Sequence, residues 1–342
     1  MTMGADYFMD KRKLGKSDIY VTPITIGCWS FGGYEDDYWG AQDQRAVERL
    51  VDAALDCGAN YFDTAFVYND GRSESSLGAA LKGKRGRALI CTKSPGYDTW
   101  EEFEGELVKS LKRLGADDVD VLMIHWPARD EEKMRDNLRF LKKVCEKGYA
   151  HYAGVSNFGV TTMKLAAELG LDIVANEFAY SLMGRAAEYE VVPYCVGHDI
   201  GITSYMSLMQ GILTGKYASI DDIPPVRRRT IQFDGTKNPL VNKAHSVPPA
   251  EAEVLALIDK LRELASQTGH TPGQLAIAWC LHRPGITTAI VGCRDEKQLF
   301  DNIKAGDIKL DADVISALEE ASRPILEKGG NTTDLFGKDR IW

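Results

Sequence analysis

The chain has 342 residues, of which 44% are hydrophobic and 27% are charged, and its formal net charge is −9. This balance is typical of a soluble globular protein with a large core and excludes a chain that is mostly disordered. The acidic surplus argues against a nucleic-acid-binding scaffold, because phosphate binding requires a surplus of Lys and Arg on one face.

The ends and the cysteines indicate the compartment. The first residues, MTMGADYFMDKRKLGKSD, lack the apolar run of a signal peptide, and no window has about 18 uninterrupted apolar residues. The seven cysteines are spread along the chain without the close spacing of a zinc, iron-sulfur or dithiol site. We therefore predict a cytoplasmic protein with reduced thiols, no membrane association and no bound metal.

From about residue 20 onward, short β-type runs alternate with amphipathic helical patterns. The eight strand-like runs are 21–29, 59–65, 87–93, 118–126, 149–158, 172–178, 201–208 and 287–293. Helical periodicity appears between them over 44–57, 101–114, 134–147, 161–169 and 188–198. Strands that are apolar nearly throughout and are separated by helices predict a parallel sheet covered on both faces.

Eight such units either close into one (β/α)8 TIM barrel or divide between two doubly wound domains. No Pro/Gly/Ser-rich linker interrupts the alternation, so we predict a single α/β barrel domain over residues 1–342. Residues 209–250, after the seventh strand, are too long for an ordinary connection and are a candidate lid loop. A helix over about 311–322 precedes a C-terminal tail, 323–342, which we expect to be irregular.

Polar residues stand at the carboxyl ends of neighbouring predicted strands. Asp63 ends the second strand, Lys93 the third and His125 the fourth, while Tyr68 lies in the loop just beyond Asp63. Adjacent parallel strands are roughly 4.8 Å apart, and barrel active sites lie at this face. We therefore expect these four side chains to converge on one mouth of the barrel.

The four residue types suggest acid–base chemistry on a carbonyl or alcohol. A Tyr hydroxyl has an ordinary pKa of about 10, and the Lys93 ammonium would lower that pKa by favouring the tyrosinate. Asp63 would hold the ammonium, and His125 could donate a hydrogen bond to a substrate oxygen or share the proton with Tyr68. The set contains no evident nucleophile.

Five short motifs on these strands resemble those of one family. They are FDTAFVYNDGRSE (62–74), CTK (91–93), MIHWP (123–127), GVSNF (154–158) and VGCRDEKQLFDN (291–302). In order and spacing they are similar to the aldo-keto reductases over nearly the whole chain. The resemblance implies an NAD(P)-dependent oxidoreductase that transfers a hydride between the nicotinamide and a carbonyl or alcohol substrate, such as an aldehyde, ketone, sugar or steroid-like compound. The catalytic tetrad would be Asp63, Tyr68, Lys93 and His125, with Tyr68 as the proton donor.

The resemblance also implies an extended cofactor across the barrel face, and no GxGxxG follows a predicted strand. The implied cofactor-binding residues are Gly27, Cys28, Trp29, Asp63, Ser156, Asn157, Glu177, Tyr205, Met206, Ser207, Leu208, Gly211, Gly215, Lys216, Gly292, Arg294, Gln298, Asp301 and Asn302. Arg294 suits a 2′-phosphate through its forked donors, which favours NADP(H). The acidic Asp295 and Glu296 beside it keep NAD(H) as the alternative.

Two positions depart from the family pattern. Asn69 stands where Gly is usual, a mild change because Asn tolerates positive φ. Glu177 stands where the family commonly has a Gln that binds the nicotinamide carboxamide, unless a one-residue slip, costly in a strand, makes Asn176 the ligand. A carboxylate would favour the cationic oxidised ring by roughly 3 kcal/mol at most, for about 5 Å and an effective dielectric of 20. We hypothesise that Glu177 tilts the protein toward oxidised cofactor.

The loop CWSFGGYEDDYWG (28–40) is crowded with aromatic residues. We predict that Trp29, Tyr34, Phe66 and Trp126 form the apolar wall of a substrate site. The acidic residues 35–37 would disfavour an anionic substrate if they point inward. We interpret the basic run 227–229 as a solvated loop, with a phosphate-binding role as the alternative.

Two other functions remain open. The chain could be a cofactor-binding regulatory subunit, since the cytoplasmic β subunits of potassium channels resemble this family. It could also be a metal-dependent barrel hydrolase, but that would need His-x-His or a carboxylate and His cluster at strand ends, and the six His are scattered. The sequence leaves the oligomeric state open.

Overall fold

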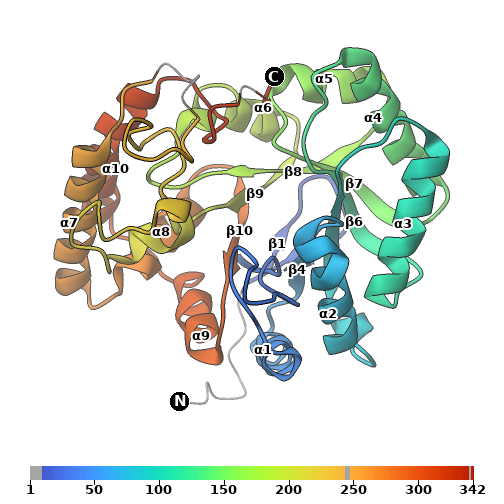
Figure 1. Cartoon of the computed structure of the whole chain (residues 1–342), viewed down its shortest axis with the longest axis horizontal. Coiled ribbons are helices and arrows are strands. Elements are labelled where there is room, and N and C mark those ends of the chain that lie inside the picture. Colours follow the sequence, from blue (N-terminus) through green and yellow to red (C-terminus); the bar gives the residue numbers. More distant parts are fainter. Residues whose placement is uncertain (1–9, 243–246, 339) are drawn as a thin grey trace.

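A computed structural model describes residues 10–242, 247–338 and 340–342. Eight parallel strands close into a barrel in the order β10-β3-β4-β5-β6-β7-β8-β9, with the helices outside it (Figure 1). The barrel strands are β3 (Ile24–Gly27), β4 (Tyr61–Asp63), β5 (Leu89–Ser94), β6 (Val119–Ile124), β7 (Ala150–Ser156), β8 (Ile173–Ala179), β9 (Gly201–Tyr205) and β10 (Ile286–Gly292). Each overlaps one predicted run and extends at most one residue beyond it, so the predicted (β/α)8 barrel is confirmed.

Ten α-helices surround the barrel in the described part of the chain. They are α1 (Gln44–Asp56), α2 (Arg72–Ala80), α3 (Trp100–Leu114), α4 (Glu131–Glu146), α5 (Val160–Glu168), α6 (Val191–Gly197), α7 (Glu251–Thr268), α8 (Pro272–His282), α9 (Glu296–Ala305) and α10 (Ala312–Gly329). The predicted helical ranges do not include α2, α7 or α8. Helix α2 is rich in small polar residues, and α8 is buried on almost every side and has no polar face. No helix in the described ranges is long and apolar enough to cross a membrane.

A short antiparallel pair, β1 (Arg12–Lys13) and β2 (Tyr20–Val21), precedes the barrel. Leu14, just after β1, and Val21 of β2 join Tyr61, Cys91 and Val121 in a buried apolar cluster. Side chains alternate along a strand, so Asp63 and Lys93 share the face of Tyr61 and Cys91, two positions further on. The strand ends therefore hold their polar side chains above an apolar layer.

Two segments were expected to be irregular, the candidate lid loop 209–250 and the C-terminal tail 323–342. The candidate lid, residues 209–250, contains only the 3-10 turns η4 (Met209–Thr214) and η5 (Pro225–Arg227), and its residues 243–246 lie outside the described ranges. The tail boundary needs a correction, because α10 continues through Gly329 with Pro324 inside it. Leu318, Ser322 and Ile325 are buried at helical spacing, so the packed face continues past the proline. Residues 1–9 and 339 of the predicted domain are also outside the description.

Candidate active site

A cavity of about 930 Å³ opens at the carboxyl ends of the barrel strands. Asp63, Tyr68 and His125 line one part of it, and Gln298 and Asn302 of α9 line another. Lys93 is fully buried beneath the cavity. The structure thus brings the four predicted catalytic residues together, at the end of a cavity that continues toward α9.

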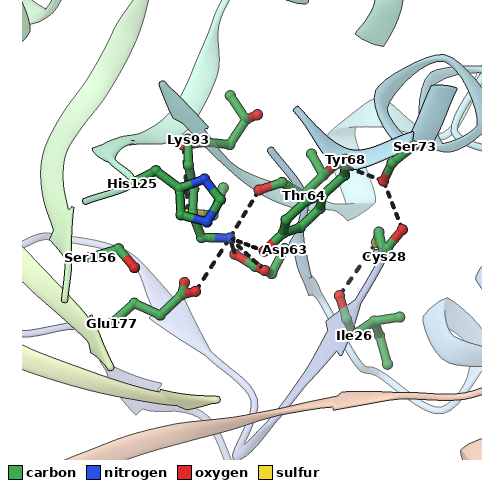
Figure 2. A network of polar contacts seen from close by, with 12 residues as sticks. Ile26, Cys28, Asp63, Thr64, Tyr68, Ser73, Lys93, His125, Ser156 and Glu177 are labelled. Carbon is green, nitrogen blue, oxygen red and sulfur yellow. Dashed lines mark hydrogen bonds and ion pairs between the residues drawn. The ribbon is translucent and has the colours of Figure 1, made fainter. Parts of the chain in front are cut away.

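Lys93 is the centre of the polar cluster (Figure 2). Its Nζ donates to both carboxylate oxygens of Asp63, at 2.6 and 2.7 Å, and to the carbonyl oxygen of Thr64 at 3.0 Å. The Tyr68 hydroxyl lies 3.5 Å from the same Nζ. Burial lowers the pKa of Lys93, but Asp63 and Glu177 outweigh this effect and raise it well above its usual range. The ammonium is therefore permanently charged and fixed in direction.

Glu177 is the second carboxylate of this cluster. Its Oε1 lies 3.3 Å from Lys93 Nζ, while Oε2 is buried and has no hydrogen-bond partner among the described residues. Burial and the neighbouring Asp63 raise the pKa of Glu177 well above its usual range. Two carboxylates thus share one ammonium, and Glu177 holds a proton more readily than an ordinary Glu does.

The net pKa shift of Tyr68 is opposite to the one expected from the sequence. Burial raises its pKa and outweighs the lowering by the Lys93 ammonium, while Asp63 and Glu177 raise it further. The ammonium moderates the shift in the pKa of Tyr68 without reversing it, because burial is the larger effect. Tyr68 is consequently a neutral phenol, ready to donate its proton.

His125 is held as a neutral imidazole. Its ring centroid lies 5.6 Å from that of Tyr68, with the rings 76° apart. Burial, Lys93 and Arg340 lower the pKa of His125 to about 3. Its backbone is fixed on both sides, since its N–H donates to Ser94 O at 2.8 Å and its carbonyl accepts from Asn157 Nδ2 at 3.0 Å. One ring nitrogen therefore carries a proton that it can donate in a hydrogen bond.

The loop after β4 is shaped by Asn69. Asn69 and Asp70 have positive φ, at 48° and 53°, and Asn69 Nδ2 donates to the carbonyl oxygens of Trp29 and Phe31, each at 2.9 Å. The amide thus supports the left-handed turn and ties it to the aromatic loop. A Gly at this position could adopt the positive φ but could not donate these two hydrogen bonds.

The Arg and Glu that follow the turn have structural partners. Glu74 is fully buried and accepts from Thr92, Ser110 and Arg113, which ties α2 to β5 and α3. Arg72 pairs with Asp37 at 2.7 Å.

Most of the predicted cofactor residues line the cavity. The exceptions are Cys28, Ser156 and Gly215. Ser156 is fully buried and accepts from Asn157 Nδ2 at 3.0 Å, so it lies one layer below the cavity. Asn157 itself has φ 62° and accepts from the Tyr205 hydroxyl at 2.7 Å.

The segment after β9 has an unusual backbone. Met206, Met209 and Gln210 all have positive φ, at 58°, 45° and 57°. Bulky residues in this region cost roughly 1–3 kcal/mol each, and such strain is concentrated at functional sites. Of these three, the cavity is lined by Met206 and Gln210, beside Gly211 and Lys216.

Sequence reasoning missed the part of the cavity wall formed by α8. Thr271, Gly273 and Gln274 line the cavity at the start of this helix, where Thr271 and Gln274 form a capping box. The sequence TPGQ carries that signal, so the helix start could have been found.

The predicted substrate residues divide into two pairs. Trp29 and Trp126 line the cavity, whereas Tyr34 and Phe66 do not. Tyr34 is 65% exposed, with the Arg72 guanidinium 4.2 Å from its ring centroid. Phe66 is buried in the core. Residues 35–37, likewise, are not part of the cavity lining.

Three carboxylate or thiol groups approach one another closely enough to bind a cation. One ligand atom each from Asp63, Cys91 and Glu177 lies within 4.8 Å of the others, and all three residues are buried. The Lys93 ammonium, however, already contacts both carboxylates. It supplies the positive charge that a metal would bring, and the absence of a metal remains a prediction.

The chain is similar to known proteins in sequence and in fold. Residues 23–323 match the model of the Aldo/keto reductase family. The chain is 32% identical over 317 residues to a probable voltage-gated potassium channel subunit beta of Arabidopsis thaliana, covering 88% of this chain and 92% of the relative. It is 29% identical to the aldo-keto reductase YhdN of Bacillus subtilis, covering 85% and 87%. Among solved structures, the glycerol dehydrogenase of Gluconobacter oxydans is similar with a TM-score of 0.75 and 26% identity, covering 96% of this chain and 98% of that one.

Proposed function

The chain belongs to the aldo/keto reductase family, a family of oxidoreductases, and from this premise we propose that it transfers a hydride between NAD(P) and a carbonyl or alcohol substrate. The observation that carries the proposal is the contact of Lys93 with Asp63 and Tyr68, beside a neutral His125, at the end of a long cavity. NADP(H) is the favoured cofactor, supported by Arg294 in the cavity lining.

The cavity wall fits a dinucleotide. Bound NAD(P)H would supply the hydride. Tyr205, Asn157, Gly211, Lys216 and Arg294, all predicted to bind cofactor, line this cavity. The buried, unpartnered Oε2 of Glu177 is a polar atom that a bound carboxamide could satisfy. Arg294 already donates to the backbone carbonyls of Trp39 and Ala41, which leaves its remaining N–H groups for a phosphate.

In the reductive direction, side chains of the protein donate the proton and stabilise the charges that develop. Tyr68, a neutral phenol, donates its proton to the carbonyl oxygen of the substrate, and the Lys93 ammonium stabilises the phenolate that remains. His125 donates a hydrogen bond to the same oxygen as negative charge develops there. In the oxidative direction the phenolate takes the proton of the alcohol.

We also propose that Glu177 biases the protein toward oxidised cofactor, and that the bias depends on pH. Because burial and Asp63 oppose its ionisation, Glu177 carries its full negative charge only at higher pH. A cationic nicotinamide ring favours the ionised form. Binding of oxidised cofactor should therefore tighten as pH rises and release a proton.

The test is a titration of the purified protein with NADPH, NADH, NADP⁺ and NAD⁺, followed by turnover assays with aldehydes, ketosteroids and sugars. Tyr68→Phe should retain cofactor binding and lose roughly 100- to 10,000-fold in turnover, the usual contribution of a general acid. If neither protein binds any of the four cofactors, the proposal is wrong.

A regulatory role is the second candidate, because the Arabidopsis relative carries the name of a channel subunit. It would be supported if the protein binds cofactor without turnover and co-purifies with a membrane complex. An enzyme alone should turn over its cofactor without such a complex.

A further inference from the structure

The mouth of the cavity carries a continuous stack of aromatic rings that ends in a guanidinium. Trp29 stacks on Tyr68, with ring centroids 5.6 Å apart, and on Tyr38 at 5.0 Å. The Arg229 guanidinium lies 4.7 Å from the Tyr38 ring and 5.2 Å from the Phe336 ring. Arg229 is thus held between two aromatic faces, and the stack connects it to the proposed proton donor.

A second guanidinium lies across the mouth, but it is neutralised. Arg340 lies 3.3 Å from the centroid of Trp126, the residue after His125. It donates to both carboxylate oxygens of Asp334, at 2.9 and 3.1 Å. Asp334 is buried and lies outside the cavity lining, so this pair holds the tail in place.

Arg229, by contrast, has no ion pair or hydrogen bond among the residues that the structure describes, and its Nε is buried. It lines the cavity together with Lys338. The carboxylates of the same lining are Asp63 and Glu177, both bound to Lys93, and Asp301 of α9. The cavity of an acidic protein therefore presents the positive charge of Arg229 without a matching carboxylate.

The Nε of Arg229 is buried without a hydrogen-bond partner among the described residues, and such an atom is costly unless a ligand completes it. The planar fork of the guanidinium matches a carboxylate or phosphate, and the flanking rings fix its orientation. The acidic residues 35–37, which could have repelled such a group, are not part of the lining.

We propose that Arg229 binds an oxyanion group of the substrate, a carboxylate or a phosphate, while Trp29 and Trp126 contact the part that carries the reacting carbon. The substrate is then an anionic aldehyde, ketone or alcohol. This inference rests on the proposed oxidoreductase function and adds the class of substrate.

Paired substrates test it. Wild-type kcat/KM should be higher for 4-carboxybenzaldehyde than for benzaldehyde, or higher for glyceraldehyde 3-phosphate than for glyceraldehyde, and the preferred pair identifies the oxyanion. Arg229→Met should lower kcat/KM for the preferred anion by roughly 10- to 100-fold, as expected for charged hydrogen bonds, and should change that for its neutral partner by less than about threefold. Arg228→Met is the control, because it removes the same charge from the neighbouring residue, which pairs with Asp221 and does not line the cavity.

Two results would overturn the proposal. Equal losses for the anionic and neutral substrates would give Arg229 a merely structural role. A weaker cofactor affinity in Arg229→Met, with an unchanged preference for the anionic substrate, would assign Arg229 to the cofactor.

A binding measurement separates this proposal from the oxidoreductase function itself. Benzoate and glycerol 3-phosphate, with benzamide and glycerol as neutral controls, can be titrated by tryptophan fluorescence without turnover, since Trp29 and Trp126 line the cavity. Binding of an anion that is lost in Arg229→Met and kept in Arg228→Met would support the oxyanion site even if no carbonyl is reduced. Equal binding in both variants, or none in the wild type, would refute it.

Discussion

The strand ends and the mouth of the cavity differ in whether their positive charge has ion-pair partners. At the strand ends the Lys93 ammonium is saturated, with two carboxylates and a backbone carbonyl around it. At the mouth, the Arg229 guanidinium has no such partner in the described ranges. A charged group with ion-pair partners stabilises the fold and fixes the direction of a proton transfer. A charged group without such partners is available to bind a ligand. The comparison predicts that substitutions in the two regions will affect different properties.

The largest expected difference is in stability. Lys93→Met leaves Asp63 and Glu177 facing each other in a buried space, so we expect the free energy of unfolding to fall by about 3–5 kcal/mol. Arg229→Met removes no ion pair and should cost less than about 1 kcal/mol. Urea unfolding of the two variants measures both values.

A second variant shows whether the loss comes from charge. Adding Glu177→Gln to Lys93→Met removes one of the two opposed carboxylates and should restore part of the lost stability. If the double variant is no more stable than Lys93→Met, packing of the lysine stem, rather than its charge, explains the loss.

The next effect is on cofactor preference. Glu177→Gln should weaken the binding of oxidised cofactor relative to that of reduced cofactor. The difference in binding free energy should reach up to roughly 3 kcal/mol if the carboxyl is fully ionised. The wild-type ratio of the two dissociation constants should change with pH, because burial and Asp63 raise the pKa of Glu177, and the variant ratio should be flat. Fluorescence titrations between pH 6 and 9 give both curves. An unchanged ratio in the variant at every pH would exclude the role.

The same division explains what the sequence could predict. Asp63, Lys93 and His125 follow apolar strand runs, and closing those strands into a barrel places their ends side by side. The proximity of these three residues could therefore be predicted from the strand pattern. Their catalytic roles were predicted from the resemblance of the motifs to the family. The raised pKa of Tyr68 could not be predicted, because it depends on the burial of the ring, which outweighs the effect of the Lys93 ammonium.

The mouth could not be derived in this way. The run 227–229 was interpreted as a solvated loop, yet Arg227 and Arg229 line the cavity. The tail is positioned by contacts of long sequence separation, such as Arg129 with the carbonyl of Lys338 at 2.6 Å and the Trp342 indole with Ala128 O at 3.1 Å. Irregular segments have no period from which such contacts can be inferred.

The smallest predicted effect concerns His125, where both regions act on one group. Lys93 at the strand ends and Arg340 at the mouth add to burial in lowering the pKa of His125 to about 3. The unfolded chain, with a His pKa of about 6.5, binds a proton between pH 6.5 and 3 that the native protein does not bind. The unfolding free energy should therefore fall as pH falls through this window, with His125 contributing about 1.4 kcal/mol per pH unit.

Unfolding of wild type and His125→Gln between pH 7 and 4.5 isolates this contribution. The difference between their unfolding free energies should shrink or reverse in favour of the variant as pH falls, because Gln has no proton to bind in the unfolded chain. His282→Gln, at an exposed position at the end of α8, provides a control for the loss of one imidazole. Parallel curves for wild type and His125→Gln would mean that His125 accepts a proton in the native state. In that case the imidazole would be charged at low pH, and the positive field from Lys93 and Arg340 would be too weak to keep it a neutral hydrogen-bond donor.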